Sequence, residues 1–570
     1  MSAALYDARP WLASYPADVP ADFAFPVVPL TRLLDDAAAA FPATVAISAD
    51  GARMSYRELR EQVDRLAGGL AGLGVAAGDR VALVLPNCPQ HVIAFFAVLR
   101  IGATVVQCNP LAAGDELRAQ LEDCTPAVVI CLDKSLAGVE SARATAGVRA
   151  VVVTTLVDYQ PAGDRLRLRL PLPASRRERR RLLAPVPKGA DVVWFRPLIG
   201  KSAPARQVEV DPAGDVAVLQ YTGGTTGVSK AAMLSHANLV ANAYQMRLWL
   251  PEATTGREVT LAVLPLFHVY GLTLCLLTTV LLAGRLALVP RFDVDLIFDA
   301  IEAEGATLLP GVPPIYQAMV DALRAQRTDL SSIRVCVSGA MRLPVDVQER
   351  FEQLSGGRLV EGYGTTEASP ATHCNPVQGT RKAGSIGIPL TATFARIVDP
   401  DDASRVLPPG ETGELIVKGP QVFLGYWGHA ANEQVLLDDG WLLTGDLAVM
   451  DDAGFFTVVD RKKDLVIAGG FNIYPAEVEA VVASLEGVVE CVVVGLPDRY
   501  RGETVKAYVV TRPGAAMTED DVRGHCAASL SAYKVPKLVE FRDELPRTAI
   551  GKALRRLLVD EELARQAGGT

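Results

Sequence analysis

Short apolar runs alternate with amphipathic segments over the first 155 residues, and this alternation restricts the chain to few fold classes. The segments 55–74 and 90–102 carry apolar residues at helical spacing. The apolar runs are strand-length and lie at 80–86, 103–110, 127–133 and 149–155. Strands that alternate with helices predict an α/β fold on a mostly parallel sheet.

A chain of 570 residues is too long for one hydrophobic core. From 262 to 460 the α/β pattern gives way to short runs separated by turns, which predicts a β-rich subdomain. After Arg461 the remaining elements suit a small α+β domain. We therefore predict a large N-terminal domain over 1–462, made of α/β subdomains and the β-rich one, and a small mobile domain over 463–570.

Composition excludes several classes of protein. The formal net charge of −9 gives no general attraction to nucleic acid. The nine cysteines show no C-x-x-C and the six histidines no metal spacing, which indicates a reduced, intracellular protein without a zinc site. No signal peptide is visible, and the uncharged run 269–284 falls short of the ~20 residues of a membrane span. We expect a cytoplasmic protein in which this run is a buried helix.

A basic segment interrupts the α/β pattern between 156 and 214. It holds eight arginines between Arg165 and Arg181, with prolines around them. Two interpretations stay open. The segment is either a solvated surface excursion, or a basic patch that contacts anionic lipid head groups peripherally on the inner face of the membrane.

A glycine-rich loop follows the apolar run 216–220, and helical spacing follows the loop. A strand, a glycine-rich loop and a helix in this order bring backbone N–H groups to a phosphate. Hydroxyls and one lysine add donors and charge, although a plain turn is the alternative. The spacing is not that of a Walker A loop. The candidate phosphate-binding residues are Tyr221, Thr222, Gly223, Gly224, Thr225, Thr226, Gly227, Val228, Ser229 and Lys230.

A second motif, EGYGTTEAS, occupies 361–369. A tyrosine between glycines can lie flat against a purine, and a glutamate suits Mg²⁺. The alternative is a helix cap made by one of the threonines. The candidate residues are Glu361, Gly362, Tyr363, Gly364, Thr365, Thr366 and Glu367.

Two further motifs lie nearer the C-terminus. Asp446 follows a Thr-Gly turn and Arg461 ends a predicted strand. The Asp446 carboxylate could accept hydrogen bonds from ribose hydroxyls, or Asp446 could simply be a turn residue. Lys552 follows Gly551 at a predicted helix start and would by itself pass for a surface lysine.

Together the motifs YTGGTTGVSKAAMLSH, YGTTE, TGD, DRKKDLVIAGGFNIYPAEVE and GK resemble, in order, those of the acyl-adenylating superfamily. The likeness is strongest to long-chain fatty-acid–CoA ligases. The resemblance implies that ATP and a fatty acid form acyl-AMP and pyrophosphate. Coenzyme A then displaces AMP to give the thioester.

The resemblance also implies residue roles. Thr222 to Lys230 would cradle the β- and γ-phosphates. Tyr363 would stack on adenine and Thr366 would contact the α-phosphate region, with Mg²⁺ at Glu367 and Thr226. Asp446 and Arg461 would bind ribose, and Lys552 would bridge the substrate carboxylate and the α-phosphate. Lys463 would be a hinge, with Gly469, Gly470 and Lys534 near coenzyme A.

The acyl site implied by the resemblance lies around His268, for which a core histidine is the alternative. The run 269–284 would form an apolar wall. Met341 and Arg342 depart from the family's usual residues and leave the pocket's shape open. Other readings stay open too: a medium-chain or aryl acid–CoA ligase, an acyl-AMP ligase that loads a carrier protein, a silent nucleotide- or fatty-acid-binding protein, and a homodimer.

Overall fold

The computed structural model describes residues 2–112, 114–187, 191–222, 230–322, 327–428, 435–468, 471–498, 500–548 and 551–568. Backbone contacts divide the chain into two units. The large unit holds 15–393 and 418–436, and the small unit holds 1–14, 394–417 and 437–570. The predicted division after residue 462 lies inside the small unit and stays a prediction.

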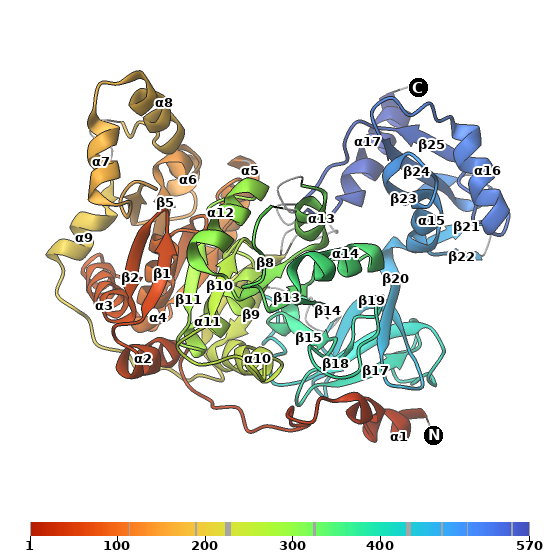
Figure 1. Ribbon diagram of the computed structural model, residues 1–570, viewed down its shortest axis with the longest axis horizontal. Coiled ribbons are helices and arrows are strands. Elements are labelled where there is room, and N and C mark those ends of the chain that lie inside the picture. The colour runs from red at the N-terminus through yellow and green to blue at the C-terminus, as the bar shows by residue number, and fades with distance from the viewer. Residues whose placement is uncertain are drawn as a thin grey trace. The chain divides into compact units, whose positions relative to one another are not determined.

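The first sheet of the large unit has seven strands within the described residues, in the order β7-β6-β5-β3-β4-β8-β9. Neighbouring strands are parallel except β8 and β9, which are antiparallel. All four strands predicted in the first 155 residues lie here, as β3 to β6 (Figure 1). The strands are β3 (Arg80–Val84), β4 (Thr104–Gln107), β5 (Val128–Leu132), β6 (Ala150–Thr154), β7 (Val193–Trp194), β8 (Val216–Thr222) and β9 (Lys230–Ser235).

The second sheet has nine described strands in the order β16-β15-β14-β13-β12-β10-β11-β1-β2. Its centre, from β14 to β1, is parallel. The α/β pattern thus continues to β14, and the prediction of a β-rich subdomain from 262 onward was wrong before residue 394. The strands are β1 (Val45–Ala49), β2 (Ala52–Ser55), β10 (Val259–Ala262), β11 (Arg285–Leu288), β12 (Leu308–Gly311), β13 (Val335–Ser338), β14 (Arg358–Gly364), β15 (Ala371–Cys374) and β16 (Ile388–Pro389).

The helices of the large unit form where the sequence supplies start signals and apolar faces. Ser55 and Glu58 make a capping box at the start of α3. Helix α4 is buried along its whole length, as expected for a helix whose residues 92–99 are all apolar. The helices are α2 (Thr31–Ala40), α3 (Tyr56–Gly72), α4 (Pro89–Arg100), α5 (Gly114–Cys124), α6 (Leu136–Arg143), α7 (Ala162–Arg169), α8 (Pro173–Leu182), α9 (Phe195–Lys201), α10 (His236–Leu248), α11 (Thr278–Leu281), α12 (Val294–Glu304), α13 (Pro313–Asp321) and α14 (Val345–Ser355).

The run 269–284 contains a buried π-helical turn, η3 (Gly271–Leu277), which continues into α11. The prediction of a buried helix is confirmed. Over the part of the chain that the structure describes, no helix combines the length and apolarity that a membrane span needs.

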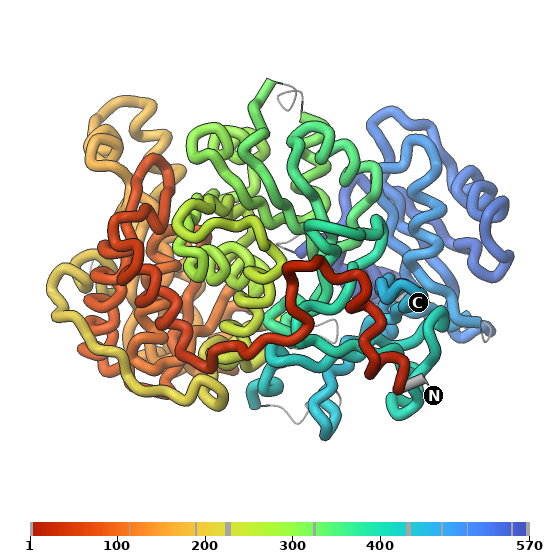
Figure 2. The backbone as a smooth tube through the Cα atoms, turned by 60° about the horizontal axis from the view of Figure 1, so that its bottom comes forward, coloured from red at the N-terminus to blue at the C-terminus, as the bar shows by residue number. Residues whose placement is uncertain are grey.

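The small unit contains a four-stranded sheet, β17-β18-β19-β20, and a C-terminal sheet in which β25 pairs with β24, counted over the described residues. Helix α1 in the first residues of the chain, drawn red in Figure 2, lies against β17, and Trp11 is buried beside Phe456. The strands are β17 (Phe394–Val398), β18 (Gly413–Lys418), β19 (Leu442–Met450), β20 (Phe456–Arg461), β21 (Val466–Ala468), β22 (Phe471–Ile473), β23 (Val488–Asp498), β24 (Gly502–Thr511) and β25 (Leu538–Phe541). The helices are α1 (Ser2–Asp7), α15 (Pro475–Ala483), α16 (Glu519–Ser529) and α17 (Arg555–Gly568).

Candidate active site

The glycine-rich loop joins two antiparallel strands rather than a strand and a helix. Thr222 ends β8 and pairs in register with Lys230, which begins β9. The predicted helix starts only at His236, so the strand–loop–helix prediction was wrong at this point. The predicted site residues Gly223, Gly224, Thr225, Thr226, Gly227, Val228 and Ser229 lie outside the described residues.

Tyr221 anchors the start of this loop. Its hydroxyl donates to the Asp123 carboxylate at 2.7 Å and lies 2.9 Å from the Gln120 carbonyl, both on α5. Burial raises the pKa of the Tyr221 phenol. The side chain therefore fixes β8 to α5, and any direct contact with phosphate from this position would come from the backbone.

The second motif lies at the end of β14, where Tyr363 meets His373 edge to face with ring centroids 5.9 Å apart. Glycine is required at 364 because an added Cβ would lie 1.8 Å from the Pro370 carbonyl oxygen. At Gly362 a Cβ would approach Val337 to 3.2 Å. The close approach of the chain at Pro370 thus explains Gly364, whereas the space at Gly362 is limited by Val337 on the neighbouring strand β13.

The threonines of this motif do not cap a helix through their side chains. Thr365 precedes a short 3₁₀ turn, Thr366–Ala368, without a side-chain capping bond. Its buried hydroxyl has no hydrogen-bond partner among the residues that the structure describes. A buried hydroxyl that lacks a partner costs free energy, so it suits a ligand atom.

Glu361 is a buried acid on the same strand. Burial raises its pKa to about 8, although the Leu343 amide and the Arg342 guanidinium favour the charged form. Its Oε2 atom has no partner within the described residues. Glu361 is therefore mostly protonated at neutral pH and can donate a hydrogen bond.

Glu367 is held by Tyr426, a residue that the sequence analysis missed. The Tyr426 hydroxyl donates to Glu367 Oε1 at 2.5 Å, and the Lys230 ammonium lies 5.2 Å from the centroid of the same ring. Tyr426 reaches this place because the segment around it runs beside β9, where Trp427 N donates to Ala231 O. One tyrosine thus contacts both the end of the phosphate loop and the candidate metal ligand.

These residues suit Mg²⁺. The ion is typically held by one or two carboxylates together with substrate phosphates and water. Glu367 supplies one oriented carboxylate, and the Thr365 hydroxyl is close in sequence. Thr226, the other predicted metal contact, lies outside the described residues.

His268 lies at the entrance to η3, where its carbonyl accepts from Leu272 N. Burial lowers the pKa of the imidazole to about 4, so the ring is neutral at physiological pH. Gln220, at the end of β8, donates to the Phe267 carbonyl at 2.9 Å, and its Oε1 has no partner in the described part of the chain. The acyl-site candidate is therefore tied directly to the strand that enters the phosphate loop.

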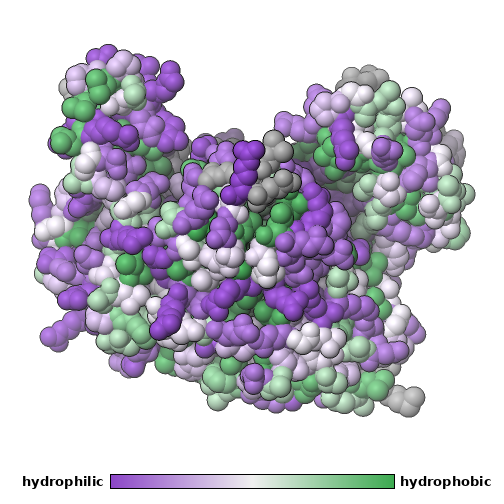
Figure 3. Space-filling view, in the orientation of Figure 1, coloured by the Kyte–Doolittle hydropathy of each residue, from purple (hydrophilic) through white to green (hydrophobic). Residues whose placement is uncertain are grey.

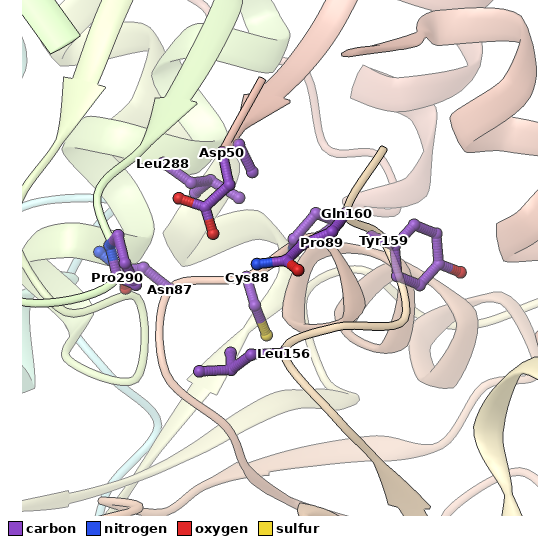
Figure 4. A pocket seen from close by; sticks show the side chains of 10 residues that line it. Asp50, Asn87, Cys88, Pro89, Leu156, Tyr159, Gln160, Leu288 and Pro290 are labelled. Atoms are coloured by element: carbon purple, nitrogen blue, oxygen red, sulfur yellow. The ribbon is translucent and has the colours of Figure 1, made fainter. Parts of the chain in front are cut away.

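A small cavity lies elsewhere in the large unit and is lined by none of the predicted site residues (Figure 4). Asn87, one of its lining residues, donates to the carbonyls of Ala262 and Leu264 and accepts from Leu266 N. Asn87 therefore fixes the backbone that leads to His268. The other lining residues are Ala49, Asp50, Cys88, Pro89, Leu156, Tyr159, Gln160, Leu288 and Pro290.

In the small unit Asp446 and Arg461 are paired across β19 and β20. The Arg461 Nε and Asp446 Oδ1 atoms are 3.0 Å apart, and the Asp446 side chain is only 5% exposed. Thr444 holds the turn before it, because its hydroxyl donates to Leu415 O and accepts from Asp446 N. The two predicted residues thus form an ion pair, and their role at ribose stays a prediction.

Lys552 lies near the same pair. Burial, followed by repulsion from Arg461, lowers its pKa from 10.5 to about 8, against the opposing effect of Asp446. A turn presents it: Thr548 N donates to Lys552 O, and Gly551 has φ 82°. Helix α17 starts only at Arg555, so the predicted helix start at Lys552 was placed too early.

Lys463 and Lys534 are the remaining predicted site residues that the structure describes. Lys463 is exposed in a 3₁₀ turn after β20. Lys534 pairs with both carboxylate oxygens of Glu477 at 2.7 Å. Gly469 and Gly470 lie outside the described residues.

Comparison with known proteins gives matches over nearly the whole chain. The model of the family described as AMP-binding enzyme matches residues 34–427, and that of the AMP-binding enzyme C-terminal domain matches 477–552. A long-chain-fatty-acid–CoA ligase of Bacillus subtilis is 42% identical over 97% of this chain and 98% of its own. A feruloyl-CoA synthase of Amycolatopsis is 37% identical over 90% of this chain and 95% of its own. The crystal structure of ATP-bound MatB from Rhodopseudomonas palustris superposes with a TM-score of 0.81, at 31% identity over 93% of this chain and 98% of its own.

Proposed function

We propose that this chain, which belongs to the AMP-binding enzyme family, catalyses the ATP-dependent ligation of a long-chain fatty acid to coenzyme A. Its support in sequence is the 42% identity to a long-chain-fatty-acid–CoA ligase. Its support in structure is the meeting of Lys552 with the Asp446–Arg461 pair, two elements that lie far apart in sequence.

In the first step a carboxylate oxygen attacks the α-phosphorus of ATP, and the bond to the β-phosphate oxygen breaks. Two anions must approach, so positive charge is needed at the reacting atoms. Lys552 supplies it beside the carboxylate, and Lys230 supplies it beside the leaving pyrophosphate. Asp446 accepts from ribose hydroxyls while Arg461 keeps that carboxylate oriented.

Tyr363 provides the aromatic face for adenine, and Thr365 and Thr366 provide hydroxyl donors near the phosphates. Glu367 would hold Mg²⁺, which neutralises triphosphate charge when bound. In this assignment the Tyr426 hydroxyl would orient the Glu367 carboxylate that holds the ion.

In the second step the thiol of coenzyme A attacks the acyl carbonyl and AMP leaves. Lys463 serves as the hinge of a C-terminal domain over 463–570, and Lys534 with Gly469 and Gly470 lies on the coenzyme A side. His268 contributes a neutral ring to the acyl site, since a charged one would oppose entry of an apolar chain. We also propose that the protein is a cytoplasmic homodimer that contacts an anionic membrane reversibly.

Release of AMP across a panel of acids, with and without coenzyme A, tests the function. Each buried methylene is worth about 0.8 kcal/mol, so kcat/KM should rise about fourfold per CH₂ until the pocket is filled. A maximum at ferulate or benzoate would favour the aryl alternative, which the feruloyl-CoA synthase relative keeps open. Turnover with an acyl carrier protein and none with coenzyme A would reject the acceptor proposed here.

A further inference from the structure

The arginine-rich segment forms a projecting helical hairpin. Helices α7 and α8 stand at one end of the large unit beside α6 (Figure 1). Arg179 donates to the Leu168 carbonyl at 3.0 Å and so ties the two helices together. At the base, Ala184 N donates to Asp133 at 2.7 Å. The hairpin is thus a fixed element of the large unit.

The tip of this hairpin is apolar and exposed. Leu170 and Leu172, in the link between the helices, are 42% and 52% exposed, and Leu166 on α7 is 63% exposed. The prolines of the link, Pro171 and Pro173, are exposed as well. Apolar and polar side chains lie side by side on the surface of this hairpin (Figure 3).

Arginines lie along both helices of the hairpin, from the apolar tip to its base. Six of the eight are exposed, and only Asp164 and Glu178 oppose them, which gives the hairpin a net charge of +6. The whole chain has a formal net charge of −9, so this positive charge is local. Ion pairs with the two acids involve Arg167 and Arg181 at 3.5 Å and 2.6 Å. The exposed arginines are Arg167, Arg169, Arg176, Arg177, Arg180 and Arg181.

We propose that the α7–α8 hairpin docks the protein on an anionic lipid bilayer, with Leu170 and Leu172 inserted between head groups and the arginines bound to lipid phosphates. An apolar tip with basic helices behind it matches a bilayer, which offers anionic phosphates above an apolar layer. A soluble acidic protein or a nucleic acid would use the arginines but would leave the leucines in water. The purpose of the docking rests on the proposed function, because long-chain fatty acids partition into bilayers.

Cosedimentation of the full-length protein with vesicles tests this inference. Vesicles of phosphatidylcholine with phosphatidylglycerol should bind the protein, and vesicles of phosphatidylcholine alone should bind it much more weakly. Each arginine near the surface is worth about fivefold in affinity. The variant R176Q/R177Q/R180Q should therefore bind about 100-fold more weakly, and added salt should reduce the difference.

Two further variants separate the lipid surface from other anions. L170S/L172S should weaken vesicle binding roughly tenfold by removing the inserted side chains. R206Q/R257Q/R327Q removes three exposed arginines elsewhere on the large unit and should bind like the wild type. The inference would be overturned if the two arginine variants lost vesicle affinity equally. It would also be overturned if the protein bound single-stranded RNA but no vesicles.

Ligase activity on a soluble medium-chain acid, without vesicles, is the separate readout for the proposed function. Every hairpin variant should match the wild type in this assay. If the wild-type protein had no ligase activity on any acid but still bound vesicles, the proposed function would be rejected and the docking surface would not.

Discussion

Raising the pH through about 8 should slow acyl-AMP formation by removing the charge of Lys552. Its pKa is lowered from 10.5 to about 8, chiefly by burial. Above this pH each further unit leaves about tenfold less of the ammonium form. The value of kcat/KM should therefore fall about tenfold per pH unit. It should level off at the rate of Lys552→Ala, about 10²–10³ below the maximum.

Because kcat/KM reports on the free enzyme, the alkaline limb of its pH profile should reflect the pKa of about 8. The limb of kcat should lie at higher pH, since bound ATP is a polyanion that favours the ammonium. Arg461 repels the same ammonium, so Arg461→Gln should move the kcat/KM limb upward even as it weakens ATP binding. Pyrophosphate exchange with fatty acid and ATP measures this half-reaction alone.

Two controls decide the result. Lys552→Arg keeps its charge at all accessible pH, so the alkaline limb should disappear in this variant. Lys552→Ala should still convert supplied acyl-AMP and coenzyme A at nearly the wild-type rate. The reasoning fails if Lys552→Arg keeps the limb, or if both half-reactions of Lys552→Ala fall together.

The same pKa has a consequence for stability. Below pH 8 the ammonium is charged in both the folded and unfolded chain, and its burial costs about 3 kcal/mol. This cost disappears as pH rises from 8 to 10.5, where only the unfolded chain holds the proton. Lys552→Met should therefore raise Tm at pH 7, with a gain that shrinks toward pH 10. A gain that does not change with pH would contradict the lowered pKa.

Three further changes test the packing of the site and the fold. Tyr426→Phe removes the donor to Glu367 and should raise the Mg²⁺ concentration needed for half-maximal adenylation about tenfold, with KM for coenzyme A unchanged. Gly364→Ala would place a Cβ 1.8 Å from Pro370 O and should lower Tm and abolish nucleotide binding, whereas Gly163→Ala meets no atom within 4 Å and should be neutral. Trp11→Ala should cost about 3–5 kcal/mol in the free energy of unfolding, measured by denaturant titration, because Trp11 is 1% exposed.

The sequence predicted the α/β class and the family correctly because both depend on local patterns. Short apolar runs fixed the strands of the first sheet, and the family models confirm the acyl-adenylating resemblance. Strand β9 was missed because its residues, KAAMLS, are mostly good helix formers. Pairing with β8 on one side and with the segment around Tyr426 on the other overrides that preference.

The sequence nominated candidate site residues where a motif carried them, as at Glu367 and Lys552, and their roles stay predictions. Tyr426 was missed because it reaches Glu367 across 59 residues of sequence, and no periodicity signals such a contact. The lowered pKa of Lys552 could not be predicted either, since it depends on burial and on Arg461 in another part of the chain.

The packing of the first residues against the small unit affects how the chain folds during synthesis. Asp7 pairs with Arg396, and the Ser14 hydroxyl donates to Ala453 O, 439 residues later. At about 5–20 residues per second, the ribosome needs on the order of a minute to make these partners. Trp11 therefore stays without its native neighbour Phe456 until that distant part of the chain has been made. These two distant segments of the chain therefore complete their folding in the same event.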